Sequence, residues 1–325
     1  MHHFITGVAG FIGSQLADAL LATGASVSGV DDLSLGRREF LRDAEARPTF
    51  HFVQADISTQ AGAASAMRSG SDMLGPIDIV WHLAANSDIS AGNHDASIDF
   101  TKTFLTTYAT VEAAKALDIT AVAFASTSAV YGELDAVLDE HTGPLLPISN
   151  YGATKLASEA ILSAAAETHF ERLWIFRFPN VVGPRLTHGA IFDFVARLAA
   201  DEPQLKVLGD GTQQKPYLHV AELVDAMRFI VANAAARRNL FNIGPSGANT
   251  SVSFMAEKAI ERFGAKVPIA YTGGDRGWVG DVPRVRYDTS RLAELGWRPR
   301  LTSDEAVVQA IDEAIASRNA ASGKV

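Results

Sequence analysis

The pattern of hydrophobic and polar positions predicts short buried strands alternating with helices up to about residue 180. The expected strands are apolar runs, and each is followed by a helix-like or loop segment. They cover residues 4–6, 25–30, 49–55, 77–83, 119–126 and 173–178. This alternation is typical of βαβ units, which form a parallel sheet and bind ligands at its carboxyl edge.

The turn after the first expected strand is rich in glycine. It reads Gly7-Val-Ala-Gly10-Phe11-Ile12-Gly13 and leads into an amphipathic helix that continues to about Leu21. Glycines at this spacing allow a tight turn and a close approach of the backbone to a pyrophosphate. The N–H groups at the start of the helix, including those of Phe11 and Ile12, favour phosphate. We therefore expect a dinucleotide to bind at this turn.

The second expected strand ends in Asp31-Asp32. An acidic side chain at this place accepts hydrogen bonds from both hydroxyls of an adenosine ribose and repels a 2′-phosphate, which favours NAD over NADP. Arg37 and Arg38 follow soon after and leave NADP open as an alternative. A glycine-rich turn with an unrelated, solvated Asp pair is the other alternative.

Small or polar residues follow three further expected strands. They are Asp56-Ile57, Ala84-Ala85-Asn86 and Ser126-Thr127. Such positions face the cofactor in a doubly wound sheet, so we expect them at the binding site. A helix cap is an equally good interpretation of Asp56.

The pattern changes after Pro179. Proline and glycine interrupt the alternation, for example in the loop at 209–216, before helix-like and strand-like segments return at 221–231 and 241–243. We expect an α/β protein with two domains. A Rossmann-type doubly wound parallel sheet would occupy 1–179, rejoined by 217–245, and a smaller C-terminal α/β substrate domain would occupy 180–216 and 246–325.

Composition and charge exclude several classes of function. A formal net charge of −9 argues against nucleic acid or an anionic membrane as the main partner, and the absence of cysteine excludes disulfides and thiolate chemistry. The histidines form no cluster with the spacing of metal ligands, so no metal is expected. No stretch reaches the length of a membrane span, and the first strand begins almost at Met1. A cytoplasmic protein is therefore expected.

Tyr151 and Lys155 are the strongest candidates for catalytic chemistry. Four residues apart on an expected helix, they share one face. A fixed ammonium favours the phenolate and so lowers the pKa of the phenol, which suits a group that moves a proton on or off an alcohol. Taken alone, the same pair also occurs on solvated helix faces.

Short motifs, including those described above, follow one another along nearly the whole chain. They are 7–13, 31–34, 56–57, 82–85, 126–132, 147–155, 177–184, 208–213, 217–220, 241–244 and 295–297. Together they resemble the extended short-chain dehydrogenase/reductases, in particular the NAD-dependent nucleotide-sugar epimerases and dehydratases. The likeness is greatest to the UDP-glucose 4-epimerase-like members.

The resemblance adds Leu83, next to Ala84 and Ala85, to the expected NAD site.

The resemblance also implies a mechanism. Tyr151 would take the proton from a sugar hydroxyl while C4 of the sugar gives a hydride to tightly held NAD. Lys155 would hold the nicotinamide ribose and lower the pKa of Tyr151, and Thr127 would hydrogen-bond the reacting oxygen. In an epimerase the 4-keto sugar then turns over and takes the hydride back on its other face.

The two residues after Thr127 distinguish branches of the family. Relatives that eliminate water across C5–C6 carry an Asp-Glu pair there, whereas this chain has Ser128 and Ala129. Neither side chain is a carboxylic acid, so 4,6-dehydration is disfavoured. A carboxylate that reaches in from elsewhere, such as Glu133, is the alternative.

The resemblance also implies contacts with a nucleotide-sugar substrate in the second half of the chain. The candidates are Asn180, Ala190, Ile191, Lys215, Tyr217 and Arg276. Lys215 replaces the usual Arg, so a point charge replaces a bidentate fork at the diphosphate. Ala190 and Ile191 either meet the nucleobase or only pack their helix.

The leading expectation is a UDP-hexose 4-epimerase, with N-acetylated and uronic sugars included. It would work as a homodimer through helices near 95–117 and 151–168. The alternatives are an NAD(P)H-dependent keto-sugar reductase, an epimerase acting at C2 or C5 of another nucleotide sugar, and an NAD-sensing binding protein.

Overall fold

The computed structural model of the chain describes residues 1–274 and 285–322 and divides into two compact units. The first unit comprises Met1–Glu133, Glu140–Phe178 and Met227–Phe241. The second comprises Leu134–Asp139, Pro179–Ala226 and the residues from Asn242 onward.

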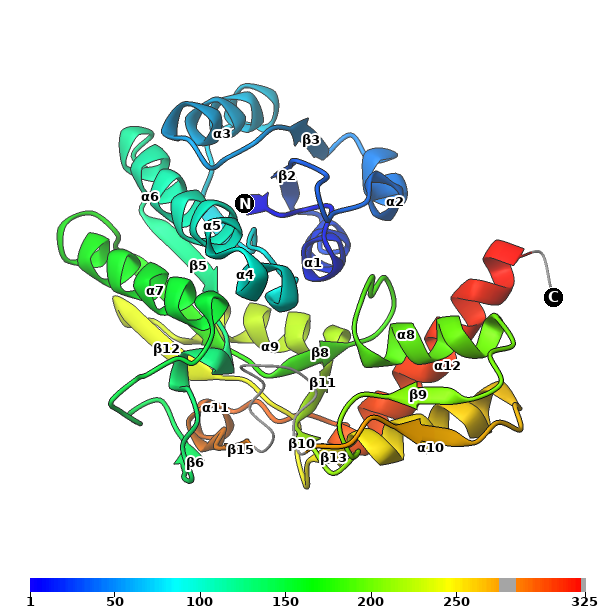
Figure 1. Cartoon of the computed structure of the whole chain (residues 1–325). Helices are drawn as coiled ribbons and strands as arrows, with labels where there is room; N and C mark the ends of the chain where they lie inside the picture. The colour runs from blue at the N-terminus through cyan, green and yellow to red at the C-terminus, as the bar shows by residue number, and fades with distance from the viewer. Residues whose placement is uncertain (275–284, 323–325) are drawn as a thin grey trace. The chain divides into compact units, whose positions relative to one another are not determined.

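A seven-stranded sheet forms the centre of the first unit (Figure 1). Its strands are β1 (His2–Thr6), β2 (Ser26–Asp31), β3 (Phe50–Gln54), β4 (Ile79–His82), β5 (Ala121–Ala125), β7 (Arg172–Arg177) and β12 (Arg238–Asn242). The order is β12-β7-β5-β4-β1-β2-β3, and each neighbouring pair from β7 to β3 is parallel. The strand order reverses between β1 and β4, which is where a Rossmann-type sheet binds its ligand. The predicted doubly wound sheet is confirmed.

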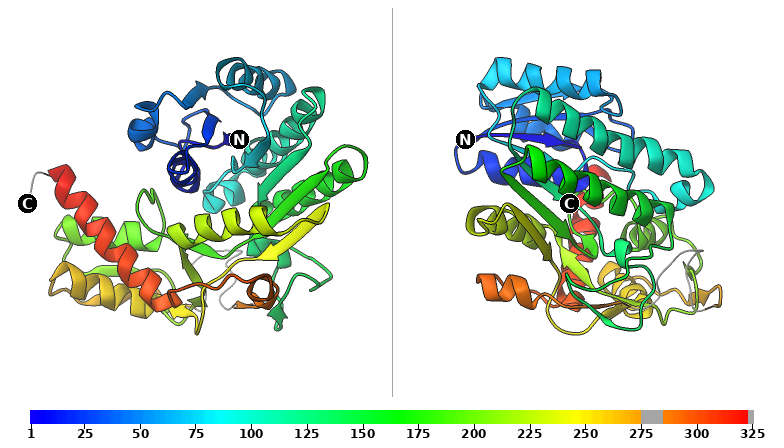
Figure 2. Two further views of the ribbon diagram at one scale, coloured as in Figure 1. Left: turned by 180° about the vertical axis from the view of Figure 1, so that it is seen from behind. Right: turned by 90° about the vertical axis from the view of Figure 1, so that its left-hand side faces the viewer.

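Helices connect these strands. They are α1 (Phe11–Leu21), η1 (Arg38–Leu41), α2 (Arg42–Glu45), α3 (Gln60–Leu74), α4 (Ile89–His94), α5 (Ala96–Asp99), the π-helical η2 (Phe100–Leu105), α6 (Thr106–Ala116), η3 (Ser128–Tyr131) and α7 (Asn150–Thr168). Figures 1 and 2 show α3, α6 and α7 side by side on one face of the sheet, with α1 on the other. Their alanine-rich faces bury against apolar strand residues such as Phe4, Val80 and Phe124. These small residues let helix and sheet approach closely.

The second unit is built from small sheets and longer helices. Its strands are β6 (Val137–Leu138), β8 (Asn180–Val182), β9 (Leu205–Val207), β10 (Gln214–Lys215), β11 (Tyr217–His219), β13 (Thr250–Ser251), β14 (Ile269–Tyr271) and β15 (Arg286–Tyr287). Its helices are α8 (Ala190–Ala199), α10 (Val252–Phe263), α11 (Ser290–Leu295) and α12 (Ser303–Ser322), and α9 (Val220–Asn233) runs on into the first unit. A second apolar core forms among α8, α10 and α12.

The bounds of the units differ from those of the predicted domains. The segment that returns to the first unit is Met227–Phe241 and not the whole of 217–245, because β11 pairs with β8 in a sheet of its own. Residues 134–139 belong to the second unit, because β6 pairs with β15. In the described parts of the chain, no helix is long and apolar enough to cross a membrane.

Two glycines allow close backbone approaches at the turn between β1 and α1. Gly7 has a φ of +71°, and a Cβ there would lie 2.9 Å from the backbone nitrogen of Ala84. A Cβ on Gly13 would lie 2.1 Å from the carbonyl oxygen of Gly7. Since real Cβ atoms do not approach so closely, only glycine permits this packing of helix against turn.

Replacing Gly13 with alanine should therefore force the turn to move. We expect Gly13→Ala to lower the free energy of unfolding by about 1–3 kcal/mol in urea titrations, as overpacking does. Gly10→Ala is the matched control, because its Cβ would lie 3.1 Å from the same Gly7 oxygen and needs a smaller shift. Equal losses in the two variants would contradict this account of the turn.

Candidate active site

The carboxyl ends of β1, β2 and β4 meet at one edge of the sheet and bring most of the predicted cofactor residues together. Gly7 follows β1, and Leu83, Ala84 and Ala85 follow β4, whose last residue is in register with the last residue of β1. The Thr6 hydroxyl accepts from the N–H groups of Leu83 and Ala84, each at 3.1 Å, which fixes this turn.

The first turn of α1 faces the same edge. Gly10 is its N-cap and has no side chain to accept from the helix, so the N–H groups that follow it remain for another acceptor. Phe11 and Ile12 open the helix and are partly exposed. This geometry suits a phosphate group.

Asp31 and Asp32 have different surroundings. Asp31 is 9% exposed and accepts from the backbone N–H groups of Ala9 at 3.0 Å and Leu33 at 2.8 Å, and burial raises the pKa of its carboxyl. Asp32 pairs with the ammonium of Lys102 at 2.5 Å. Although burial opposes it, the hydrogen bonds from Lys102 and Ser34 lower the pKa of Asp32.

Asp56 and Ile57 follow β3 at the same edge. Asp56 is exposed and accepts from the N–H of Ser58 at 2.9 Å, while Ile57 is buried. The cap of α3 is Thr59, whose hydroxyl accepts from Gly62. The helix-cap interpretation of Asp56 is therefore wrong, because the residue closes a short turn of its own.

These features together fit NAD. The glycine turn is a cradle that a single Cβ at Gly7 or Gly13 would fill, the first turn of α1 offers N–H groups, and Asp31 lies at the end of β2. Each Asp31 oxygen accepts one backbone N–H and keeps capacity for a ribose hydroxyl.

The candidate catalytic residues come from the end of β5 and the start of α7. Thr127 follows β5 and caps η3 by accepting from the N–H of Ala129, and its side chain acts to lower the pKa of the Tyr151 phenol. Tyr151 lies in the first turn of α7, which Ser149 caps. Lys155 is 2% exposed and donates from Nζ to the carbonyl of Ala125 at 2.7 Å.

The Lys155 ammonium lies among aromatic rings. Its Nζ is 4.7 Å from the centre of the Phe124 ring and 5.9 Å from that of Tyr151. Burial lowers the pKa of Lys155 to about 7, against the opposing effects of Glu159 and Asp99.

The predicted direction of the Tyr151 shift is wrong in this structure. Burial, followed by the negative charge of Asp99, raises the pKa of the phenol, and the hydrogen bond from Thr127 only partly offsets this rise. The physical reason is that desolvation disfavours the phenolate of Tyr151 and also favours the neutral amine of Lys155 over its ammonium form.

A buried ion pair lies behind this cluster. Glu159, one turn after Lys155 on α7, accepts from Arg177 through both oxygens at 3.0 and 2.6 Å, and it also accepts from Ser126. The guanidinium of Arg177 lies 4.8 Å from the centre of the Tyr131 ring. Glu159 and Arg177 are 7% and 4% exposed. The pair ties α7 to the ends of β5 and β7.

The predicted substrate residues belong to the second unit. Tyr217 and Asn180 are register partners in β11 and β8, Asn180 being exposed and Tyr217 buried. Lys215 is partly exposed in β10. Ile191 is 2% exposed in the core of this unit, which favours helix packing over base contact for its side chain, whereas Ala190 is partly exposed. Arg276 lies outside the described residues.

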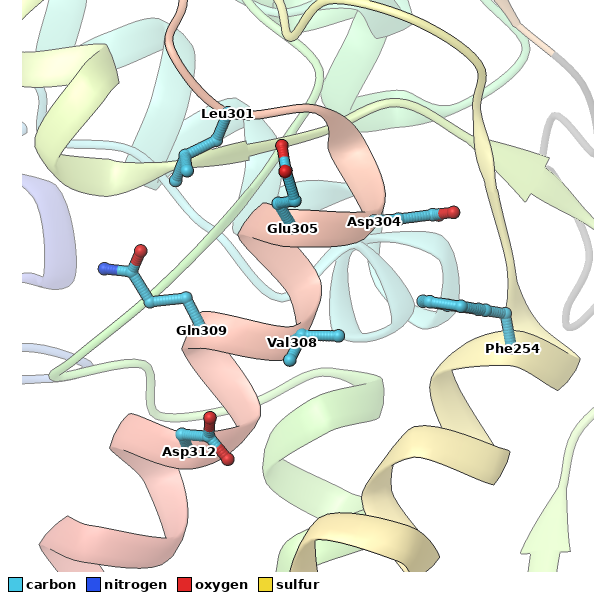
Figure 3. A pocket seen from close by; sticks show the side chains of 7 residues that line it. All are labelled: Phe254, Leu301, Asp304, Glu305, Val308, Gln309 and Asp312. Atoms are coloured by element: carbon cyan, nitrogen blue, oxygen red, sulfur yellow. The ribbon is translucent and has the colours of Figure 1, made fainter.

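A separate pocket in the second unit lies between α10 and α12 (Figure 3). Asp304, Glu305 and Asp312 of α12 line it, together with Phe254 of α10. Three carboxylates repel a diphosphate, so this pocket is not a candidate substrate site. In the described ranges, no group of three or more His, Cys, Asp or Glu side chains is placed to hold a metal ion.

Lys102 and Asp99 were not among the predicted site residues. Both lie in a segment, α5 and η2, that the sequence suggested as a dimer interface. Lys102 meets Asp32 across 70 positions of sequence. No local pattern in the sequence predicts this contact. The signal that the sequence does offer is the presence of two charged residues, Asp99 and Lys102, in a segment rich in Thr and Phe.

The chain belongs to the NAD dependent epimerase/dehydratase family, whose sequence profile matches residues 3–244. A UDP-glucose 4-epimerase from Mycolicibacterium smegmatis is 32% identical over 324 residues, covering 96% of this chain and 98% of that protein. The predicted family is confirmed, and NAD is the cofactor of the family to which the chain belongs.

Two solved structures extend the likeness to nearly every residue. The UDP-glucose 4-epimerase of Thermotoga maritima with UDP-glucose is 26% identical, with a TM-score of 0.86 and coverage of 98% of this chain and 100% of that chain. The Thermus thermophilus UDP-glucose 4-epimerase complex with NAD is 27% identical, with a TM-score of 0.84 and coverage of 97% and 99%.

Lys155 should make stability depend on pH. Its pKa is about 7 in the folded protein and about 10.4 in an unfolded chain, so between these values the unfolded state binds more protons and stability rises with pH. Between about pH 7 and pH 9, nucleotide-free protein should gain up to about 1.4 kcal/mol per pH unit from this group in urea titrations. In Lys155→Met, the unfolding free energy should depend less steeply on pH. An unchanged slope in this variant would contradict the lowered pKa of Lys155.

The buried ion pair should matter far more than an exposed one. Arg177→Met leaves the Glu159 carboxylate buried without its cation, and we expect a loss of about 3–5 kcal/mol of unfolding free energy. Arg262→Met is the matched control, because Arg262 makes the same two-bond contact with Asp312 at a site where both side chains are at least 40% exposed. Its loss should stay below about 1 kcal/mol. Similar losses would refute the burial argument.

Proposed function

We propose that this protein is an NAD-dependent nucleotide-sugar epimerase that inverts C4 of a UDP-hexose through a transient 4-keto sugar. The observation that carries the proposal is the cluster of Thr127, Tyr151 and Lys155 at the carboxyl end of β5. The UDP-glucose 4-epimerases of similar sequence and fold support the substrate class.

Each residue of this cluster has a distinct role. Tyr151 takes the proton of the sugar hydroxyl and returns it, and Thr127, whose side chain acts to lower the pKa of the phenol, binds the same reacting oxygen. Since burial raises the pKa of Tyr151, its phenolate needs a nearby positive charge, which Lys155 provides 5.9 Å from the ring centre. NAD, when bound, supplies reversible hydride transfer at the neighbouring sheet edge.

Dehydration is disfavoured by the residues beside Thr127. Ser128 and Ala129 begin η3 and carry no acid that could remove a proton from C5 or protonate a leaving hydroxyl. Glu133, the alternative carboxylate, is exposed. A reaction that returns the hydride to the same sugar therefore fits these side chains better than elimination.

The substrate contacts form part of the same proposal. We assign the diphosphate to Asn180, Lys215 and Arg276, with Tyr217 beside Asn180 and the backbone at Ala190 and Ile191 near the nucleobase. The register of β8 and β11, in which Asn180 and Tyr217 are partners, supports placing these two residues side by side. A homodimer through the helices near 95–117 and 151–168 stays a prediction, supported by the exposed ring of Phe100. A cytoplasmic location also stays a prediction.

The direct test is nuclear magnetic resonance of the purified protein with UDP-glucose, UDP-galactose, their N-acetylated forms and UDP-glucuronic acid, without added NAD. We expect interconversion of axial and equatorial C4 epimers with no net change in nicotinamide absorbance. A requirement for stoichiometric NADH would favour the keto-sugar reductase instead. Absence of epimerisation at C4 across UDP-, dTDP-, GDP- and CDP-sugars would overturn the proposal.

Tyr151→Phe removes the proton-transfer group and leaves the aromatic packing in place. We expect kcat to fall by roughly 10²–10⁴-fold, the usual contribution of a general acid–base group, with NAD still bound after purification. Tyr108→Phe is the matched control, because this exposed tyrosine of α6 lies outside the proposed site. Full activity in Tyr151→Phe would remove Tyr151 from the mechanism without deciding the substrate.

A further inference from the structure

Asp99, the last residue of α5, carries a buried carboxylate with an incomplete set of partners. Its side chain is fully buried, and Oδ1 accepts from the amide of Asn86 at 2.8 Å. In the part of the chain that the structure describes, Oδ2 has no hydrogen-bond partner. An unsatisfied buried carboxylate oxygen is costly, so its retention calls for a physical reason.

The surroundings hold this carboxylate in one place. A Cβ on Gly92 of α4 would lie 1.9 Å from Asp99 Oδ2, so the helix fits against the carboxylate only because that position is glycine. The carbonyl of Gly92 accepts from Asn150 of α7 at 3.0 Å. Asn86 is itself fixed by Thr103 of η2, whose hydroxyl accepts from the Asn86 N–H at 3.1 Å. Asp99 thus belongs to a packed cluster against the first turn of α7.

Two carboxylates act on the Lys155 ammonium, and they differ in one respect. Glu159 is bonded through both oxygens to Arg177 and so brings its own positive charge. Asp99 has an amide, from Asn86, in place of a cation. The negative charge of Asp99 is therefore the less compensated of the two.

The other charged groups near Asp99 do not replace Lys155. Burial raises the pKa of Asp99, Asn86 and Lys155 lower it, and Asp88, before α4, adds a further negative charge that raises it. His94 of α4 is exposed, and Lys102 of η2 pairs with Asp32. Tyr151 and Lys155 of α7 are the titratable groups on which Asp99 acts.

We propose that Asp99 is a positioning residue that acts through Lys155: its buried carboxylate is a second counter-charge, beside Glu159, that retains the ammonium form of Lys155 while Tyr151 exchanges a proton with the substrate. The inference rests on the proposed function for the role of Tyr151. Burial alone pushes Lys155 towards the neutral amine at neutral pH, where it no longer favours a phenolate. Asp99 opposes that loss, and the same charge makes the Tyr151 phenolate a stronger base.

Asp99→Asn keeps the size and the contact with Asn86 while removing the charge. We expect the midpoint of Lys155, followed by the ¹³Cε resonance and assigned with Lys155→Met, to fall by about one pH unit, at the lower end of the effect of a nearby charge. Both limbs of the kcat profile should move to lower pH, because removing a negative charge favours the neutral amine and the phenolate alike. A purely structural role would lower the rate and leave the profile in place.

Asp95→Asn is the matched control. Asp95 caps the same helix, α5, by accepting from Ser97 at 2.9 Å and is exposed, so the variant removes an equal charge from the surface and should shift neither midpoint nor profile. An unshifted Lys155 midpoint in folded Asp99→Asn overturns the proposal. A second measurement needs no variant: if the ¹³Cγ resonance of Asp99 in the unchanged protein titrates above the Lys155 midpoint, Asp99 is neutral when Lys155 is charged, and the proposal fails.

The resonance measurements do not require catalysis. A shifted Lys155 midpoint in a protein that epimerises no sugar would retain the role of Asp99 and overturn the proposed function. Epimerase activity, with an unshifted Lys155 midpoint and an unmoved kcat profile in Asp99→Asn, would support the proposed function and overturn the role of Asp99.

Discussion

The positive charge of Lys155 imposes the constraint on which the rest of the candidate site depends. Its ammonium is almost fully buried, and burial of an unpaired charge is strongly unfavourable. The carbonyl of Ala125, the face of the Phe124 ring and the carboxylate of Glu159 stabilise the ammonium. Glu159 in turn needs Arg177 to balance it. One buried charge thus organises the ends of β5 and β7 and the first turns of α7.

The same constraint reverses the simplest expectation for Tyr151. A neighbouring ammonium lowers the pKa of a phenol in water, but here burial acts on both groups and moves their pKa values in opposite directions, Tyr151 upward and Lys155 downward. The Tyr151 phenol therefore keeps its proton at neutral pH in this structure.

The cofactor edge rests on backbone geometry more than on side chains. The left-handed conformation of Gly7 and the contact between Gly13 and the Gly7 carbonyl bring α1 close to β1, and this closeness leaves the helix N-terminus open to a phosphate. Asp31 is then held by two backbone N–H groups at the end of β2. Lys102 reaches Asp32 from η2 and joins a further element to the same edge.

The sequence alone determined the parallel sheet, the glycine turn, the Tyr151–Lys155 pair and the family, because hydrophobic periodicity and short motifs are local properties of the chain. Only the tertiary structure decided the environment of those groups. Burial set the direction of the Tyr151 shift, and packing of α5 and η2 brought Asp99 towards α7 and Lys102 to Asp32. Desolvation and long-range charge depend on which distant segments enclose a group, and no pattern in the neighbouring sequence records that.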